Sequence, residues 1–403
     1  MSQTPPSIPD RAPEQPASAA QPRGLFFIWA AVAFVGVSLA LQMGLNANFL
    51  AEDIGIEPVQ IGHLEAVRES CGVLALGVLA LLAGMAEPLI GAAMLALLAV
   101  GISAFTHVHS FTWVVLMSLV WSQGLHVWMP LPASMTLSLA EPGRAGHRLG
   151  QTQAAGAVGF GSGLLLALGL SSLLGVGMRP MYTIAGVTAL AAAAACLAIP
   201  RQIKAHRPRL VFRRRYSLYY ALCLLEGWRK QITISFAGFL LVKVHHTPLQ
   251  RMLIMMIAVQ VAGYFASPAV GRLIDKIGER RVLLFYYICL IAFFIAYALI
   301  PDPRVLYGIY IADSAFFVFA MALTTYANRI APSGDLTPTL SMGVAMNHVA
   351  AVVMPLICGT LWQMYDFRWP FYTGAAAALV SIVLALRLPR LARAKEPAHA
   401  EAL

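Results

Sequence analysis

Long apolar stretches separated by short polar connectors form the basic pattern of this chain. Twelve of these stretches are long enough to cross a bilayer as a helix, which takes roughly 20 apolar residues. They lie near 24–46, 59–83, 86–106, 110–136, 149–173, 178–199, 216–242, 253–274, 281–300, 304–328, 338–362 and 369–388. The runs are continuous rather than alternating, which favours helices over a barrel. The pattern predicts an all-α membrane protein with twelve transmembrane helices.

Composition agrees with a chain built for lipid. Of its 403 residues, 59% are hydrophobic and 11% charged, whereas soluble domains carry about 25% charged residues. The five cysteines all fall inside predicted helices, as small packing residues do. Four glycines of the fifth predicted helix (Gly156, Gly159, Gly161 and Gly163) indicate close helix packing.

Several classes of chemistry have no motif in this sequence. A phosphate-binding Gly-x4-Gly-Lys loop is missing, and so is a serine nucleophile elbow. Histidines and carboxylates at membrane depth are scattered singly along the chain rather than spaced as a metal site. We therefore expect no enzyme activity, no cofactor and no metal.

The basic residues are distributed by side of the membrane. The net charge is +10. If the connectors alternate from an inner N-terminus, 20 of the 28 Lys and Arg residues fall on inner segments and five on outer ones. The positive-inside rule then predicts a plasma (inner) membrane protein with both termini cytoplasmic. This topology accounts for the charge without a nucleic-acid partner, and we expect a monomer whose partners are the lipid bilayer and a small-molecule substrate.

A basic stretch divides the chain into two halves of six predicted helices. Residues 201–216 hold seven bases and no acid, which suits contact with lipid headgroups. The predicted organisation is a disordered cytoplasmic tail, a first half, a cytoplasmic linker, a second half and a second cytoplasmic tail. These parts span 1–23, 24–200, 201–215, 216–388 and 389–403, respectively.

A polar island follows the eighth predicted helix and reads Gly-Arg-Leu-Ile-Asp-Lys-Ile-Gly-Glu-Arg-Arg. Gly271 and Gly278 permit a tight turn, and Asp275 can pair with a neighbouring base or sit at a helix N-terminus, where the dipole favours an anion. With its Gly-x3-Asp-x2-Gly spacing and the six-plus-six layout, the chain resembles the major facilitator superfamily of membrane transporters.

That resemblance implies a substrate held between the halves near the midplane and moved by alternating access. It also implies that Asp275, Arg280 and Arg281 latch the halves together when the cytoplasmic side is closed. An ordinary basic turn is the alternative. The equivalent place after the second helix, residues 83–89, carries no base, so the latch is expected on one side only.

The second predicted helix carries three charges near mid-membrane. Glu65, Arg68 and Glu69 are spaced to share one helical face. Because the cluster sums to minus one, one carboxylate lacks a local base and is a proton-carrier candidate. The alternative is a salt bridge that only holds helices together. Either way, each charge needs a partner or a watery cavity.

The seventh predicted helix carries Glu226, Arg229 and Lys230, which sum to plus one. Glu226 can neutralise one of the two bases but not both. The spare base is suited to a carboxylate or phosphate of a substrate. Alternatively, it pairs with the surplus acid of the second helix.

The tenth and eleventh predicted helices add polar groups at similar depth. Asp313 is a proton carrier or a partner for Arg229 or Lys230. His348 titrates near neutral pH if it is wet, and otherwise it is a hydrogen-bonded packing residue. Further candidates for substrate contact are the polar residues Asn46, Gln123, His126 and Asn347.

Together these features predict a secondary active transporter for a small polar or anionic organic solute, coupled to protons. An efflux pump for toxic amphipathic compounds is the second hypothesis. A non-transporting membrane assembly factor on the same fold is the third.

Overall fold

The computed structural model describes residues 20–205 and 212–389, which are almost entirely helical. Most of the two predicted tails (1–23 and 389–403) and residues 206–211 of the predicted linker lie outside this range. The elements are α1 (Ala20–Asn48), η1 (Phe49–Asp53), α2 (Pro58–Leu81), α3 (Glu87–Ala104), α4 (Phe111–Trp128), α5 (Leu131–Leu139), α6 (Ala145–Leu173), α7 (Met178–Leu197), η2 (Arg214–Tyr216), α8 (Ser217–Gln231), η3 (Ile232–Ala237), α9 (Gly238–Lys243), α10 (Leu249–Ile277), α11 (Glu279–Leu299), α12 (Pro303–Ala315), η4 (Phe316–Ala320), α13 (Met321–Ile330), α14 (Ser333–Met364) and α15 (Arg368–Ala385).

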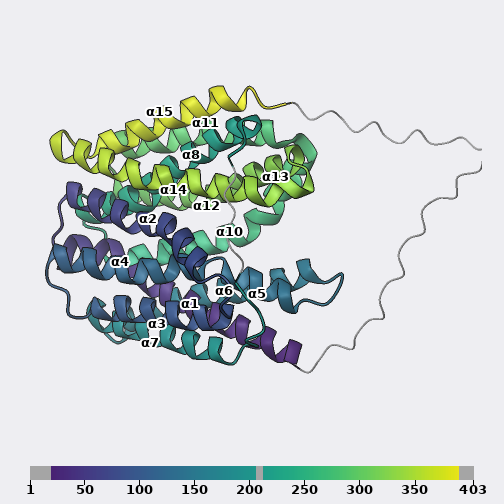
Figure 1. The fold of residues 1–403 in the computed structure, drawn as a ribbon. Helices are drawn as coiled ribbons and strands as arrows, with labels where there is room; N and C mark the ends of the chain where they lie inside the picture. The colour runs from purple at the N-terminus through teal and green to yellow at the C-terminus, as the bar shows by residue number, and fades with distance from the viewer. Residues whose placement is uncertain (1–19, 206–211, 390–403) are drawn as a thin grey trace, which may run out of the picture.

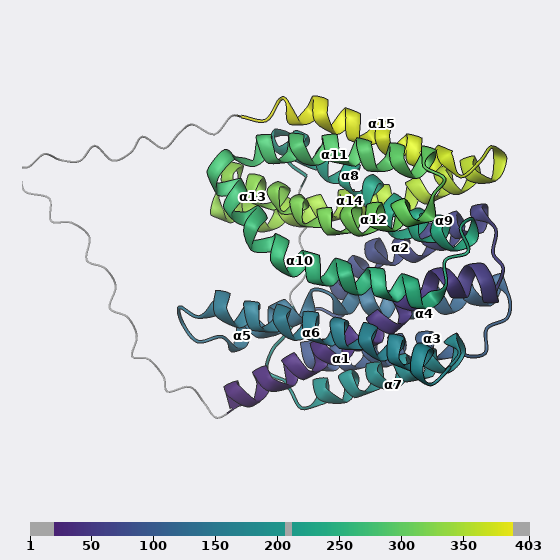
Figure 2. The same ribbon diagram turned by 180° about the vertical axis from the view of Figure 1, so that it is seen from behind.

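The helices form two groups that lie side by side (Figures 1 and 2). In the first group α1 packs on α6 and α7, and α3 packs on α4 and α7. In the second, α8 packs on α14 and α15, and α11 packs on α15. Between the groups, α2 lies against α14 and α6 lies against α10. These two helix pairs form the main contacts between the halves.

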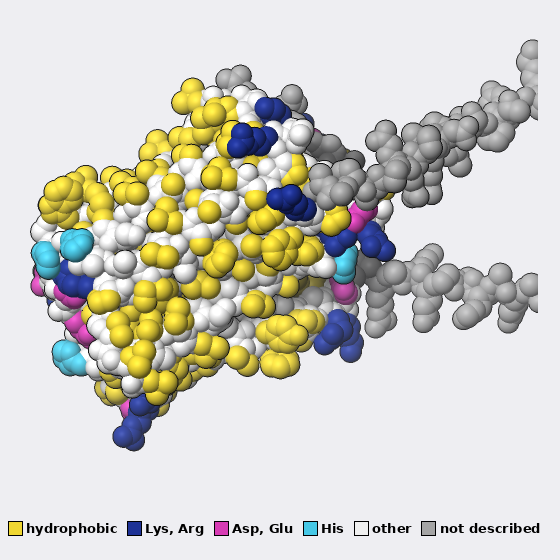
Figure 3. Space-filling model, turned by 90° about the horizontal axis from the view of Figure 1, so that it is seen from below, with side chains coloured by type: hydrophobic (Ala, Val, Ile, Leu, Met, Phe, Trp, Pro, Cys, Tyr) yellow, Lys and Arg dark blue, Asp and Glu magenta, His cyan; other side chains and the backbone are white. Residues whose placement is uncertain are grey.

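The prediction of an all-α membrane protein is confirmed. Within the described residues, ten helices are long and apolar enough to cross a membrane by length and composition. The other two predicted spans, α2 and the run from α8 to α9, are those that carry the charge clusters. Hydrophobic side chains cover the face drawn in Figure 3, and its acidic and histidine side chains gather at the two ends.

Three predicted helices are interrupted, which corrects the expectation of continuous spans. The fourth breaks between Trp128 and Leu131, where Pro130 and Pro132 remove backbone donors. In the seventh span, the π-helical turn η3 follows the charged residues of α8 directly. In the tenth, the 3-10 turn η4 follows Asp313 by three residues. Turns of this kind are frequent at functional sites in helices.

The polar island after the eighth span is helical on both sides of a single residue. Gly271 and Asp275 belong to α10, and α11 begins at Glu279, so the predicted eleven-residue connector reduces to Gly278. Gly278 has φ +82°, a conformation that favours glycine, as the tight turn requires.

Among the described residues, the side-chain hydrogen bonds and ion pairs of the island lie within the second half. Asp275 is exposed, and Arg280 donates to the backbone oxygen of Leu388 at 3.3 Å. Arg281 is exposed as well, and the neighbouring Glu279 is paired with Arg329. The latch that the resemblance implies remains a prediction for the state in which this end is closed.

The turn that lacks the second signature holds the linker instead. The backbone amides of Gly84 and Glu87 donate to the oxygens of Ala205 and Ile203, each at 2.9 Å. The amide of Ala205 returns a bond to the oxygen of Met85, also at 2.9 Å. Backbone pairing of this kind needs no basic side chain, which fits the absence of bases from 83–89.

The two halves are bonded to each other at the end opposite the linker. The Asn48 side-chain amide donates to the Thr247 oxygen at 3.0 Å, and Lys243 Nζ donates to the Ile56 oxygen at 3.1 Å. Between helices of the two halves, residues 20–205 and 212–389 include no hydrogen bond or ion pair at the linker end. Figure 2 shows α10 and α13 diverging from α5 and α6 there. On the predicted orientation, this is an inward-facing arrangement.

Glycines of α6 allow its close approach to α1. The prediction of close packing is confirmed for Gly156, Gly159 and Gly163 but not for Gly161. A methyl group at Gly159 would overlap the backbone of Ala33, and one at Gly163 would meet Val37. At Gly161 it would meet nothing within 4 Å. The small residues of α6 therefore act on one helical face.

We expect Gly159→Ala to lower the free energy of unfolding by about 1–3 kcal/mol, because the added methyl forces α1 away from α6. Thermal unfolding of the purified protein in detergent measures this. Gly161→Ala, two residues away, is the matched control and should leave stability unchanged or slightly higher. Equal effects at the two positions would contradict the packing argument.

Candidate transport site

A cavity of about 660 Å³ lies between the two halves near mid-depth. The first half contributes residues of α1, α2, α4 and α6 to its wall. The second half contributes residues of α8, η3, α9, α10, α12, η4 and α14. A site walled by both halves can bind a solute differently when the halves move.

The charged face of α2 opens onto this cavity. Glu65 is 1% exposed and is paired with Arg68, as the helical spacing predicts. Arg68 also lies 4.0 Å from Glu69, and its guanidinium stands 5.6 Å from the ring centre of Trp121. One base is thus shared by two carboxylates at the cavity wall.

Ser122 orients His126 on the neighbouring helix α4, which packs against α2. The Nδ1 atom of His126 lies 2.9 Å from the Ser122 backbone oxygen, one helical turn earlier on α4. The Ser122 hydroxyl donates to the backbone oxygen of Arg68 at 2.9 Å, which ties α4 to α2. Since a carbonyl oxygen only accepts, this contact is a hydrogen bond in the tautomer that carries its proton on Nδ1, which leaves the lone pair on Nε2.

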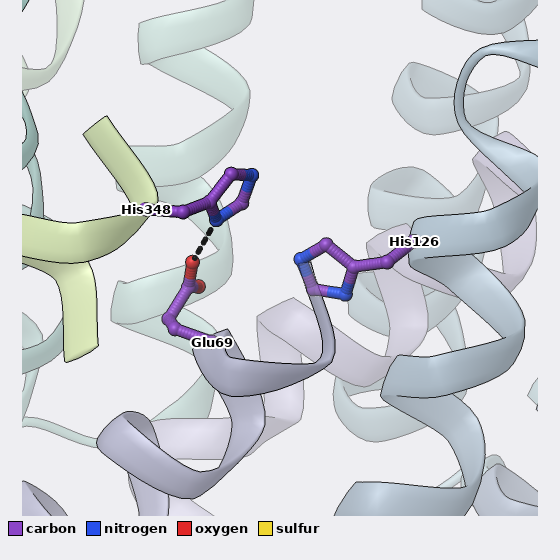
Figure 4. Close-up of side chains that lie close together, drawn as sticks. All are labelled: Glu69, His126 and His348. Atoms are coloured by element: carbon purple, nitrogen blue, oxygen red, sulfur yellow. Dashed lines mark hydrogen bonds and ion pairs between the residues drawn. The ribbon is translucent and has the colours of Figure 1, made fainter. Parts of the chain in front are cut away.

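A hydrogen bond joins the halves through Glu69 and His348. Nδ1 of His348 on α14 lies 3.2 Å from a carboxylate oxygen of Glu69 on α2 (Figure 4). The ring of His126 stands 5.3 Å from that of His348, centre to centre. One ligand-type atom from each of the three residues lies within 4.8 Å of the other two. These groups are scattered singly along the chain, and three helices distant in sequence bring them together in the fold.

Behind the wall lies a buried trio of charges from α8 and α12. Arg229 is 2% exposed, and Asp313 is fully buried. The guanidinium nitrogens of Arg229 lie 3.9 Å from Glu226 and 3.8 Å from Asp313. Of the two roles expected for Asp313, partnership with Arg229 is the one that the contacts support.

Neighbouring side chains complete the surroundings of the trio. The Tyr286 hydroxyl donates to Glu226 at 2.9 Å, and the Thr233 hydroxyl donates to Asp313 at 2.7 Å. The ring centre of Phe317 lies 3.7 Å from the guanidinium of Arg229. Thr233 and Phe317 also line the cavity, whereas the three charged residues do not. A change in the trio can therefore reach the cavity wall.

The charge sums that the sequence gives for single helices change when residues that meet from different helices are grouped. Glu226, Arg229 and Asp313 form a group with a net charge of minus one. Lys230, one residue after Arg229, faces the cavity, and no hydrogen bond or ion pair connects it to another of the described residues. The spare base of the seventh span is Lys230, and the spare acid belongs to the trio.

The remaining candidates divide between wall and packing. Asn46 lines the cavity and accepts a hydrogen bond from Gln42 at 3.3 Å. Asn347 lies off the cavity and donates to the Cys223 backbone oxygen at 3.5 Å. Gln123 is also off the cavity, and its side-chain nitrogen is buried with no partner among the described residues.

Sequence reasoning missed several polar residues of the wall. Gln260, Tyr310, Ser314 and Ser235 all line the cavity. Each is a polar group within a mostly apolar helix, and that was the available signal. Uncharged groups cost little at membrane depth compared with ions, so this signal is weak.

Comparisons with known proteins place this geometry in context. A family model described as Major Facilitator Superfamily matches residues 28–334 and 220–402. A solved mutant of the nucleoside transporter NupG is similar over 91% of this chain and 99% of its own, with TM-score 0.73 and 15% identity. A bacterial homolog of the human lysosomal transporter Spinster, inward-facing and occupied, is similar over 92% and 96%, with TM-score 0.69 and 12% identity. No curated protein sequence matches the chain.

We expect Arg229→Met to lower the free energy of unfolding by about 3–5 kcal/mol, since it leaves two buried carboxylates without their base. Thermal unfolding in detergent measures the loss. Adding Glu226→Gln and Asp313→Asn to this variant should recover part of it. Arg368→Met, which breaks an exposed pair with Asp366, is the control and should change stability little. A stable Arg229→Met variant would show that the trio is not held by charge.

Proposed function

Because the chain belongs to the major facilitator superfamily, we propose that it is a secondary active transporter. Its proposed cargo is a small polar or anionic organic solute, moved by alternating access and coupled to protons. The observation that carries this proposal is Lys230, a base with no ion pair among the described residues, in a cavity walled by both halves. The proposed setting is a plasma (inner) membrane, with both termini cytoplasmic and the protein monomeric.

The cavity suits a solute of metabolite size. Its volume of about 660 Å³ falls within the roughly 300–1,000 Å³ typical of small-molecule sites. Lys230 offers a charge for a carboxylate or phosphate, and Asn46 and Gln260 add hydrogen-bonding groups. Resemblance to the fold of a nucleoside transporter supports testing nucleosides alongside organic anions.

Proton coupling is proposed for the buried trio. With a net charge of minus one in a water-poor environment, Glu226, Arg229 and Asp313 become neutral when they take up one proton. Asp313 is the proposed carrier, because it is fully buried and its Oδ1 accepts no hydrogen bond from the described residues, having only the 3.8 Å ion-pair contact with Arg229. Thr233 and Phe317 join the trio to the cavity wall, which gives the proton a route to influence the substrate site. Glu65, which shares Arg68 with Glu69, is the second candidate.

Efflux of amphipathic compounds is the second candidate function. The apolar part of the wall includes the flexible or aromatic side chains Met43, Met129, Met252, Met256, Trp121 and Phe239. Methionines adapt to ligands of varied shape, which suits a broad-specificity pump. A deletion strain sensitised to cationic dyes, with no defect in solute uptake, would favour this function.

We expect Lys230→Met to abolish the binding of an organic anion, because the cavity loses its unpaired base. A thermal-shift screen of nucleosides, mono- and dicarboxylates and cationic dyes first identifies a stabilising compound. Lys276→Met, an exposed base on α10, is the control and should keep the shift. Stabilisation by anions that persists in Lys230→Met would contradict the assignment of this residue.

We expect Asp313→Asn to lose uptake driven by a pH gradient while retaining exchange of labelled for unlabelled solute, because the amide mimics a permanently protonated carboxyl. Proteoliposomes loaded with the compound found in the screen measure both. Asp366→Asn, in an exposed pair, should behave as the unmodified protein. Full gradient-driven uptake in both Asp313→Asn and Glu65→Gln would rule out the proposed coupling.

A further inference from the structure

We propose that Glu69, His126 and His348 form a binding site for a divalent transition-metal ion of the zinc type. The three side chains come from α2, α4 and α14, and all three line the central cavity. Two imidazoles and one carboxylate are a ligand set that zinc uses in sites that keep an open position. This proposal is independent of the solute that the protein carries.

The separations of the ligand atoms suit such an ion. At zinc–ligand distances of about 2.0–2.1 Å, tetrahedral ligand atoms stand ~3.3 Å apart. Glu69 and His348 already meet at 3.2 Å, and all three ligand atoms lie within 4.8 Å of one another. To complete the set, the His126 ligand atom must come closer by up to about 1.5 Å, from 4.8 Å to ~3.3 Å. An ion here replaces the proton that His348 shares with Glu69.

His126 is prepared to act as a ligand. Its Nδ1 proton is directed to the Ser122 backbone oxygen at 2.9 Å, which leaves the lone pair on Nε2. Figure 4 shows one ring nitrogen of His126 directed toward Glu69 and His348. Metal-bound histidines usually donate their other ring proton to a carbonyl or carboxylate in this way, which fixes the ring.

Nearby charges determine which further ligand a bound ion would take. Arg68 lies 4.0 Å from Glu69 but is paired with Glu65, so this helix supplies net negative charge to the site. Lys230 also faces the same cavity. With one carboxylate ligand, a bound divalent ion retains a net charge of plus one. Its open position toward the cavity is therefore suited to water or to an anionic group.

Such an ion connects the two halves of the protein. Glu69 and His126 belong to the first half and His348 to the second, so coordination requires both. Binding should accordingly depend on His348 as strongly as on His126. A surface site on one half alone would not show this dependence.

The test uses the purified full-length protein with Zn²⁺ as the only added ligand. Isothermal titration should show one tight site, and removing any ligand should weaken it by more than about 100-fold, since losing even an outer partner costs 10–100-fold. The variants are Glu69→Gln, His126→Gln and His348→Gln. Co²⁺ provides a second readout, because a site with nitrogen and oxygen ligands and low coordination gives strong visible absorption that each variant should abolish.

Surface histidines provide the control. His245 and His246 are adjacent in an outer connector on the predicted topology, so the double variant His245→Gln/His246→Gln removes the alternative site most able to bind zinc. We expect it to retain the tight site and the Co²⁺ spectrum. Loss of binding in this double variant, or full binding in His348→Gln, would overturn the proposal. Either result would leave the transport proposal standing.

Discussion

Charges placed at membrane depth must be matched by opposite charges or by water, and this constraint organises the centre of the molecule. Arg229 illustrates it: a fully embedded guanidinium is tolerable because Glu226, Asp313 and aromatic faces surround it. This requirement joins α8 to α12 through their side chains. The π-helical turn η3 and the 3-10 turn η4 lie next to these same residues. The helices therefore depart from regular α geometry where the charges pair.

The same constraint gives two adjacent residues different roles, one in the buried charge network and one in the cavity wall. Arg229 is buried and compensated, whereas Lys230 points into the cavity with no ion pair among the described residues, although its charge acts on Glu69 across the cavity. Adjacent positions on a helix differ by about 100°, so one turn can serve both a structural network and a cavity wall. The acid that balances Arg229 comes from α12, far away in the chain, which leaves Lys230 available.

The sequence was sufficient for the all-helical membrane class and the charged face of α2, because both depend on local periodicity. It was not sufficient for relations between helices. The choice of Arg229 rather than Lys230 as the partner of Asp313 depends on tertiary packing, which no spacing encodes. The convergence of Glu69, His126 and His348 depends on it as well. The polar island was predicted as a connector, yet α10 and α11 extend through it to Gly278. Charge content suggested a loop, while backbone propensity continued the helices.

The linker contributes to an asymmetry between the two halves. Its start pairs with the turn at 84–87 of the first half, and its end places Arg213 and Arg215 against Asp335 of α14. The linker is therefore fastened to both halves at the end where their helices diverge. In the proposed alternating access the two halves move relative to each other. The bonds of the linker to each half must then either move with that half or break. The turn at 84–87 has no basic side chain and pairs with the linker through its backbone, so the proposed latch at this end rests on the single island around Gly278. Because this pairing uses backbone groups alone, it needs no base at 83–89.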